Sequence, residues 1–436
     1  MYNIESLNYS DVLNSKSYFD YSYGNITKGI NLFSELVIRN PHDANLWVEL
    51  GFAHLKNIEF SMAKKCFDTA FDIDPYNPNT NCALGLYYYE SGYFRKARQF
   101  YVNTLKIDKN SEWGKLNLSL LEQTVGNNRV GLELYENREK EQCLSQHEEF
   151  QHSQIQELIS LNTSLKNKAL LVIGEQGFGD QLMICLYLKK LMSLGFKVTY
   201  LVNEKLFTFL KNISDLKGIK IKKELSDKDL RESDFKVFSM SIPYLFYKSE
   251  LNFTGLNIKK SQLTKSFKNY PSEIKKLFTN RKIKVGLAWS GRPSQIRNSF
   301  RSIRLEFLDK IFKLTNYEFF ILQKISNNKE KKIISKYRNL HNISKHLDNF
   351  ADTAFFTSKM DLVISTCTSL VHLSGLLNKK TFLLLSKIHD PRWNYDKEKV
   401  LYDSVKIFKQ RKLNDWFEPL NEIYKILYHN LNKIRR

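Results

Sequence analysis

The fold is decided by residues 169–202, which read ALLVIGEQGFGDQLMICLYLKKLMSLGFKVTYLV. Residues 169–173 are a continuous apolar run, which is typical of a strand buried in a parallel sheet. A glycine-rich turn follows at 174–180, then a helical stretch that ends at Gly195, and residues 197–202 predict the next strand. This order predicts a β-α-β unit whose first turn lets the backbone approach a ligand at a helix N-terminus.

The glycines of this turn have the spacing GxxGxG, at Gly174, Gly177 and Gly179. Dinucleotide-binding domains carry GxGxxG instead, and phosphate-binding P-loops end in Gly-Lys-Ser/Thr, which this turn lacks. The turn therefore indicates an anion or a sugar near the start of the helix. A tight turn that serves packing alone is the alternative.

A second series of strands and helices begins near residue 282. Apolar runs predict strands at 283–289, 317–322, 362–365 and 381–385, with helices near 305–312 and 370–377 between them. Strands that alternate with helices and short loops predict a parallel sheet covered by helices on both faces.

Polar residues follow each of these strands at its carboxyl end. They are Ser290, Arg292 and Arg301 after the first strand, Gln323 and Lys324 after the second, Thr368, Ser369 and His372 after the third, and Asp390 and Trp393 after the fourth. Ligands of such sheets bind outside the carboxyl ends of the strands. We therefore expect two α/β halves that face each other across a cleft lined by these loops.

The first third of the chain repeats itself with a period of 34 residues. The first copy carries Trp47, Leu50, Gly51, His54, Ala63, Phe67, Ala70 and Pro75, and the second has Asn81, Leu84, Gly85, Tyr88, Ala97, Tyr101, Thr104 and Lys109 in the same slots. This pattern resembles the tetratricopeptide repeat, in which small residues let two antiparallel helices approach and aromatic residues fill the gaps between pairs. With a degenerate copy at 10–43 and a fading one after residue 110, about three repeats are expected. Such arrays bind peptides, dimerise or pack on a neighbouring domain, and the sequence does not choose among these roles.

Charge and cysteine content restrict the class of protein. The net charge of +21 favours anionic partners, but no basic helix or base-stacking motif indicates nucleic acid. The five cysteines form no CxxC pair, so neither a zinc site nor a disulfide framework is indicated. No signal peptide and no membrane-spanning run is evident. We expect a cytoplasmic protein with at most peripheral contact at the inner face of a membrane.

Six segments in one order resemble a known family. They are GEQGFGD at 174–180, VGLAWSGRPS with RNSFRSI at 285–303, FFILQK at 319–324, NFADTA at 349–354, DLVISTCTSLVHLSG at 361–375, and DPRWNYD with LYDSVKIFKQ at 390–410. They look like tetratricopeptide-repeat glycosyltransferases, whose catalytic part is similar to the heptosyltransferases of glycosyltransferase family nine and distantly to O-linked N-acetylglucosamine transferases. The resemblance implies a GT-B-like fold of two Rossmann-like domains that face a cleft, with no metal and no cofactor besides the donor substrate.

Pattern and resemblance together predict five parts. They are a tetratricopeptide-repeat domain at 1–140, a helical connector at 141–166, a first Rossmann-like, acceptor-side domain at 167–275, a second Rossmann-like, nucleotide-sugar domain at 276–410, and a C-terminal helix at 411–436.

The resemblance also implies roles for residues. Asp180 occupies the position of the family's general base, although a helix-capping role explains its position too. The remaining candidates are expected to bind the nucleotide sugar: Gly177, Gly179, Ser290, Arg292, Arg301, Gln323, Lys324, Thr368, Ser369, His372, Asp390 and Trp393. His372 as a structural residue and Trp393 as a core residue are the alternatives.

One position departs from the family pattern. Cys367 stands where many relatives have an aspartate before the Thr-Ser turn, so a carboxylate that would orient the donor or His372 is missing. The leading hypothesis is a metal-independent transferase that moves a sugar from a nucleotide-diphosphate sugar to a glycan, lipid-linked or protein acceptor. The alternative is an inactive transferase-like protein that acts as a scaffold, with a protein partner or a second copy bound through the repeats.

Overall fold

The computed structural model describes residues 25–138, 165–246, 258, 263, 265–293, 295, 297–325, 328–393 and 401–434. Almost all of the connector expected at 141–166 lies outside these residues. The described chain forms two compact units. The first contains the helical part up to residue 138 together with two later segments, 291–301 and 388–393. The second contains the rest, and each unit is described by itself.

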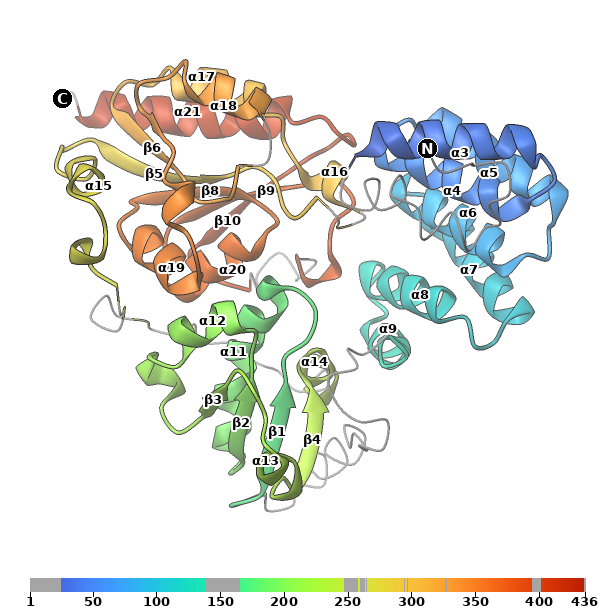
Figure 1. The fold of residues 1–436 in the computed structure, drawn as a ribbon, viewed down its shortest axis with the longest axis horizontal. Helices are drawn as coiled ribbons and strands as arrows, with labels where there is room; N and C mark the ends of the chain where they lie inside the picture. Colours follow the sequence, from blue (N-terminus) through green and yellow to red (C-terminus); the bar gives the residue numbers. More distant parts are fainter. Residues whose placement is uncertain are drawn as a thin grey trace, which may run out of the picture. The chain divides into compact units, whose positions relative to one another are not determined.

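The first unit is built of antiparallel helical hairpins (Figure 1). After α3 (Ile26–Arg39), the hairpins are α4 (Ala44–Lys56) with α5 (Phe60–Ile73), α6 (Pro78–Glu90) with α7 (Phe94–Ile107), and α8 (Glu112–Thr124) with α9 (Asn128–Tyr135). The two short helices α16 (Asn298–Arg301) and η8 (Pro391–Trp393) belong to the same unit. These hairpins confirm the helical repeats predicted from the 34-residue period.

Glycines at equivalent positions set the close approach within the α4–α5 and α6–α7 hairpins. A Cβ at Gly51 would lie 2.4 Å from the Phe67 ring, and one at Gly85 would lie 2.4 Å from the Tyr101 ring. Both rings are almost completely buried. Since an aromatic ring needs this space, these two repeats keep a glycine on the first helix and a ring on the second.

The second unit contains two parallel sheets. The first has the strand order β3-β2-β1-β4, and Ala169 of β1 is paired with Lys197 of β2. Its strands are β1 (Ala169–Ile173), β2 (Lys197–Leu201), β3 (Lys220–Lys222) and β4 (Phe235–Phe238), and its helices are α11 (Phe178–Ser193), α12 (Glu204–Leu210), α13 (Asp227–Arg231) and α14 (Ile242–Leu245). The predicted β-α-β unit is therefore confirmed as β1, α11 and β2.

The second sheet has six strands in the order β10-β9-β8-β5-β6-β7, all parallel. The strands are β5 (Ile283–Ala288), β6 (Tyr317–Ile321), β7 (Leu340–His341), β8 (Leu362–Thr366), β9 (Thr381–Leu385) and β10 (Val405–Lys409). The accompanying helices are α15 (Ser272–Lys276), α17 (Asp309–Phe312), α18 (Asn328–Ile334), α19 (Phe350–Ser358), α20 (Ser369–Leu376) and α21 (Phe417–Ile434). Helical repeats followed by two Rossmann-like sheets are the architecture predicted for a GT-B-like fold, and this fold class is confirmed.

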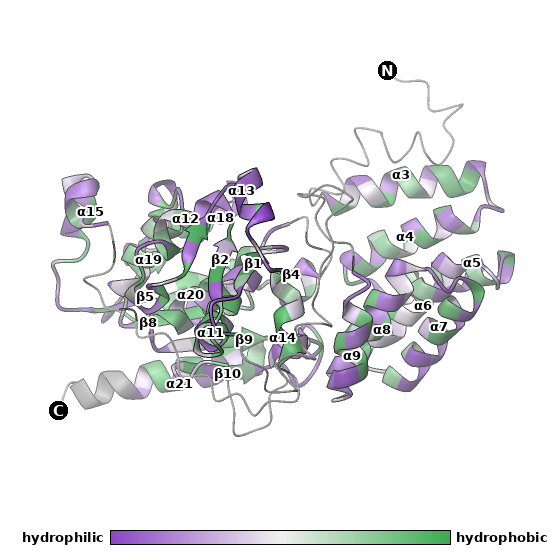
Figure 2. Cartoon of the chain, turned by 90° about the horizontal axis from the view of Figure 1, so that it is seen from below, coloured by the Kyte–Doolittle hydropathy of each residue, from purple (hydrophilic) through white to green (hydrophobic). Residues whose placement is uncertain are grey.

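The core of the second sheet includes residues from the end of the chain. Leu420, Ile423 and Leu427 of α21 are buried among the residues of β5, β6 and β8. The Tyr317 hydroxyl donates a hydrogen bond to the Leu427 carbonyl oxygen over 2.9 Å. The helices carry both hydrophilic and hydrophobic residues (Figure 2). Helix α21 is therefore an integral layer of this sheet.

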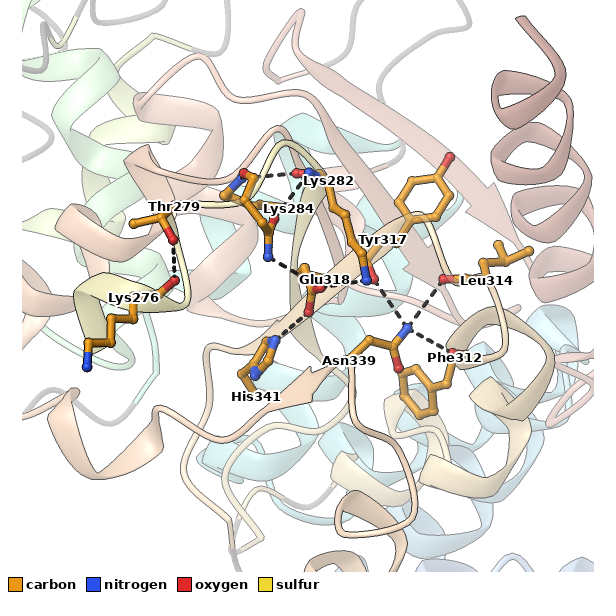
Figure 3. Close-up of polar contacts among 11 residues, drawn as sticks. Lys276, Thr279, Lys282, Lys284, Phe312, Leu314, Tyr317, Glu318, Asn339 and His341 are labelled. Carbon is orange, nitrogen blue, oxygen red and sulfur yellow. Dashed lines mark hydrogen bonds and ion pairs between the residues drawn. The ribbon is translucent and has the colours of Figure 1, made fainter. Parts of the chain in front are cut away.

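A buried carboxylate ties together the amino-terminal edge of this sheet (Figure 3). Glu318 accepts a hydrogen bond from Asn280 over 3.4 Å, lies 2.9 Å from the Lys282 ammonium, and contacts the His341 imidazole. The Asn339 amide donates to the carbonyl oxygens of Phe312, Leu314 and Tyr317. Because ligands of such sheets bind at the carboxyl edge, this network serves structure at the opposite edge.

None of the helices among the described residues combines the length and the apolar character needed to cross a membrane.

Candidate functional site

Asp180 lies in the first turn of α11, directly after the turn that follows β1. Its Oδ2 atom accepts a hydrogen bond from the Gly177 backbone N–H over 2.9 Å, so the third residue of α11 satisfies the backbone N–H of the N-cap residue. A carboxylate in the first turn of a helix also interacts favourably with the partial positive charge of the helix N-terminus. The N-cap of α11 is therefore Gly177 and not Asp180, although the Asp180 side chain does make a capping contact. The role of Asp180 as a general base stays a prediction.

The turn before α11 is stabilised by residues that were not among the predicted site residues. The buried Glu175 carboxylate accepts a hydrogen bond from the Met240 N–H over 2.9 Å, and the Glu175 N–H donates to the Ser239 hydroxyl over 3.3 Å. Gln176 has a φ of +58°, a left-handed conformation that is uncommon outside glycine. These contacts fix the turn against the residues that follow β4, so the start of α11 has a defined position.

The start of α20 is the second part of the candidate site. Thr368 is the N-cap of this helix, and its side chain makes no capping hydrogen bond to the helix backbone. Its hydroxyl lies 3.1 Å from the Ser365 hydroxyl. The first backbone N–H groups of a helix carry partial positive charge and attract anions. The turn from β8 into α20 therefore presents a helix N-terminus near Thr368 and Ser369.

The first turns of α11 and α20 are in contact with each other. A Cβ at Gly179 would lie 2.9 Å from Cδ2 of His372 and 3.4 Å from the Cα of Ser369. The Phe178 ring is also 5.1 Å from the Phe350 ring at the start of α19. Only a residue without a side chain fits at position 179, so the two sheets contribute helix N-termini to one place.

Tyr402 holds His372 at this junction. The Nδ1 atom of His372 is 3.0 Å from the Tyr402 hydroxyl, and both side chains are buried. A Cβ at Gly375 would lie 2.4 Å from the Tyr402 ring, so this glycine makes room for the tyrosine. A hydrogen bond at one imidazole nitrogen fixes the ring and sets which nitrogen carries the proton. Tyr402 lies within the segment LYDSVKIFKQ, but no sequence pattern indicates its contact with His372.

Replacing Tyr402 with phenylalanine removes the hydroxyl and leaves the ring. We expect the free energy of unfolding to fall by about 1–3 kcal/mol, because a buried polar partner of His372 is lost. Urea denaturation followed by circular dichroism measures this change. Tyr428→Phe, on the exposed part of α21, is the matched control. Equal stability of the two variants would show that the Tyr402–His372 contact contributes nothing.

Ser290, Gln323 and Lys324 lie at the carboxyl ends of β5 and β6. The Gln323 side-chain oxygen accepts hydrogen bonds from the backbone N–H groups of Trp289 and Ser290 over 2.7 and 3.1 Å. Its Nε2 group donates to the Ser290 hydroxyl over 3.0 Å. The Lys324 side chain is 65% exposed, and its ammonium donates to the Ser344 carbonyl oxygen over 3.0 Å. Gln323 thus shapes the turn after β5, and binding roles for these residues stay predictions.

Four other candidates belong to the first unit. The Arg301 guanidinium lies so close to Gly291 that a Cβ there would be 2.3 Å from Nη2. The Asp390 carboxylate accepts a hydrogen bond from the Arg392 side chain over 2.8 Å, and Trp393 is buried. Arg292 is exposed. The candidates are therefore divided: Arg292, Arg301, Asp390 and Trp393 lie in the first unit, and the others in the second.

The second-unit part of the site combines three chemical elements. It has a carboxylate at Asp180, a buried imidazole at His372, and a helix N-terminus at Thr368 that is suited to an anion. Among the described residues, no group of three or more His, Cys, Asp or Glu side chains has the arrangement needed to hold a metal ion. The cluster has the groups needed to accept a proton and to stabilise negative charge.

Three solved structures illustrate what this chain is similar to. E. coli ADP-heptose LPS heptosyltransferase II matches with 11% identity and a TM-score of 0.41, covering 60% of this chain and 99% of that one. A mutant form of the O-GlcNAc transferase of Thermobaculum terrenum matches with 12% identity and a TM-score of 0.33, covering 98% and 93%. MamA matches with 18% identity and a TM-score of 0.25, covering 30% and 75%. No family model and no curated protein sequence matches the chain.

Proposed function

We propose that this protein is a glycosyltransferase that uses a nucleotide-diphosphate sugar as donor and a hydroxyl group as acceptor. The contact between the first turns of α11 and α20 is the observation that supports this proposal most strongly. Gly179, the residue before Asp180 in α11, lies against His372 and Ser369 of α20, which supports a shared site for these residues. The six sequence segments that resemble family-nine transferases include both turns.

The proposed reaction assigns one task to each group. Asp180 accepts the proton of the acceptor hydroxyl while the acceptor oxygen forms a bond to the anomeric carbon of the sugar. The bond between that carbon and the diphosphate oxygen breaks, and the nucleoside diphosphate leaves with the electron pair. The N–H groups at the start of α20, together with His372, stabilise the negative charge on this leaving group.

The remaining assignments are parts of the same proposal. Ser290, Gln323 and Lys324 shape the donor side of the site at the ends of β5 and β6. A glycan, a lipid-linked sugar or a protein serves as the acceptor. The repeats take a protein partner or a second copy. The boundaries at 140, 166, 275 and 410 separate the functional parts.

A charge placed at the start of α20 tests the donor site. Thr368→Asp adds a carboxylate at the helix N-terminus. Thr368→Asn adds a neutral amide of the same shape as that carboxylate. Both residues are good N-caps, so the helix is retained in each variant. We expect Thr368→Asp to weaken binding of the donor by at least about ten-fold, because like charges repel at a site for an anion. Thr368→Asn should bind as the wild type does.

Isothermal titration with ADP-, UDP- and GDP-sugars measures this binding, and release of nucleoside diphosphate measures turnover. Equal affinity of the Asp and Asn variants would contradict a diphosphate site at α20. A wild-type chain that binds no donor, yet binds a protein partner through its repeats, would support the scaffold function instead.

A further inference from the structure

Two loops that follow strands of the second sheet pack within the helical unit. Segment 291–301 comes after β5, and segment 388–393 comes after β9, yet both belong to the first unit. The Phe300 ring lies 5.9 Å from the Phe60 ring of α5. A Cβ at Gly92, after α6, would lie 3.9 Å from the Ile388 side chain. The repeats thus hold pieces of chain that lie about 200 and 300 residues further on.

A buried ion pair joins both loops to the second helical hairpin. Glu90, the last residue of α6, is 1% exposed, and its Oε1 atom is 2.7 Å from Nε of Arg297. The Nη2 group of Arg297 donates to Glu90 Oε2 over 3.3 Å and to the Ile388 carbonyl oxygen over 3.1 Å. One guanidinium therefore connects a repeat helix, the loop after β5 and the loop after β9.

The Glu90–Arg297 pair is surrounded by further contacts within the first unit. The Arg297 guanidinium lies over the Tyr89 ring, 5.5 Å from its centre. The Tyr89 hydroxyl is in turn 2.8 Å from the Thr124 hydroxyl of α8. A buried carboxylate is costly without a cation, so the pair requires that the loop with Arg297 stays in place.

We propose that Glu90 and Arg297 are positioning residues that order both loops on the repeats before a nucleotide sugar binds. These loops carry Arg292, Arg301, Asp390 and Trp393, which the sequence assigns to the donor. The proposal rests on the proposed transferase function for its effect on the donor. Loops that are ordered in advance bind a ligand more tightly, because less entropy is lost on binding. On this proposal, Glu90 raises donor affinity by ordering the loops, although it is not among the residues assigned to the donor.

The experiment uses the full chain with Glu90→Gln, and with Arg297→Lys as a milder variant in case the first does not fold. Glu133→Gln, which removes a charge from the exposed Arg129–Glu133 pair of α9, is the matched control. Hydrogen exchange of peptides from both loops is measured without ligand. Donor KM and kcat are measured from nucleoside diphosphate release, with ADP-, UDP- and GDP-sugars as probes.

We expect Glu90→Gln to raise hydrogen exchange in both loops and to raise the donor KM by roughly ten-fold or more, with kcat nearly unchanged. Glu133→Gln should change neither quantity. Unchanged exchange in the loops, exchange raised equally over all the repeats, or an unchanged KM would each overturn the proposal. A wild-type chain that binds no nucleotide sugar would overturn the proposed function, and loop exchange would then still decide whether the pair orders the loops.

Discussion

Replacing Asp180 with asparagine should lower the rate of sugar transfer by roughly 10²- to 10⁴-fold, which is the usual contribution of a general base. Donor binding should stay close to that of the wild type, since Asp180 is not among the proposed donor contacts. Single-turnover transfer at saturating donor measures the first quantity, and isothermal titration measures the second.

The hydrogen bond from the N-cap to residue 180 makes asparagine a clean substitution at this position. Gly177 donates its backbone N–H to one oxygen of Asp180 over 2.9 Å. An asparagine carbonyl oxygen accepts the same hydrogen bond but cannot take a proton from an acceptor hydroxyl. The start of α11 should therefore stay intact, and any loss of rate reports the missing carboxylate.

Asp229→Asn is the matched control, because Asp229 is likewise the third residue of its helix, α13, and accepts a hydrogen bond from the N-cap backbone N–H. That substitution should leave transfer unchanged. Full transfer by Asp180→Asn would mean that Asp180 serves only as a cap. An equal loss of transfer in both variants would point to a general loss of structure.

Replacing Arg297 with methionine should lower the free energy of unfolding of the helical unit by about 3–5 kcal/mol. Methionine has a similar length but no charge, so the buried Glu90 carboxylate loses its cation. Thermal and urea denaturation, followed by the circular dichroism of the helices, measures the change.

The loss of stability in the Arg297→Met variant should depend on pH in a defined direction. Burial already raises the pKa of Glu90 above its ordinary value of 4.5, and Arg297 opposes this rise. Without Arg297 the pKa of Glu90 in the folded protein rises further, so the folded state holds a proton that the unfolded state has released. Stability then falls as the pH rises from the unfolded pKa to the folded pKa. The loss should be smaller at about pH 5 than at about pH 7.5.

The double variant Glu90→Gln with Arg297→Met provides the control. Removing both charges leaves no buried ion, so much of the lost stability should return. A double variant as unstable as Arg297→Met alone would show that shape, and not charge, is what matters at this position. A loss that does not change with pH would contradict the role assigned to Glu90.

Sequence patterns predicted the main elements because these elements depend on local hydrophobic order. Strands 169–173 and 381–385 begin and end at the predicted residues. The short strands β3 and β7 and the strands β4 and β10 were not predicted. β7 has only two residues, and the burial of β10 alternates irregularly. Such strands depend on their neighbours in the sheet more than on their own residues.

Contacts between distant residues could not be predicted from one sequence. His372 and Asp180 were predicted as site residues because each lies next to a recognisable turn at the end of a strand, and their roles stay predictions. Tyr402 contacts His372 from 30 residues away, and Glu90 contacts Arg297 from 207 residues away. Neither pair has a local spacing that would indicate it, since only the folded chain brings the partners together. The sequence also left open whether the repeats pack on anything.

Segments 291–301 and 388–393 pack with the repeats in one unit. The repeats therefore cannot be deleted or exchanged without changing the surroundings of these segments. A fragment that begins near residue 165 would retain both segments and lose Glu90, so Arg297 would meet water in place of its carboxylate. A chimaera that exchanges the repeats for those of another protein would need to carry the matching segments along. In related sequences, substitutions at position 90 should be accompanied by substitutions at position 297, because the two side chains form one buried ion pair.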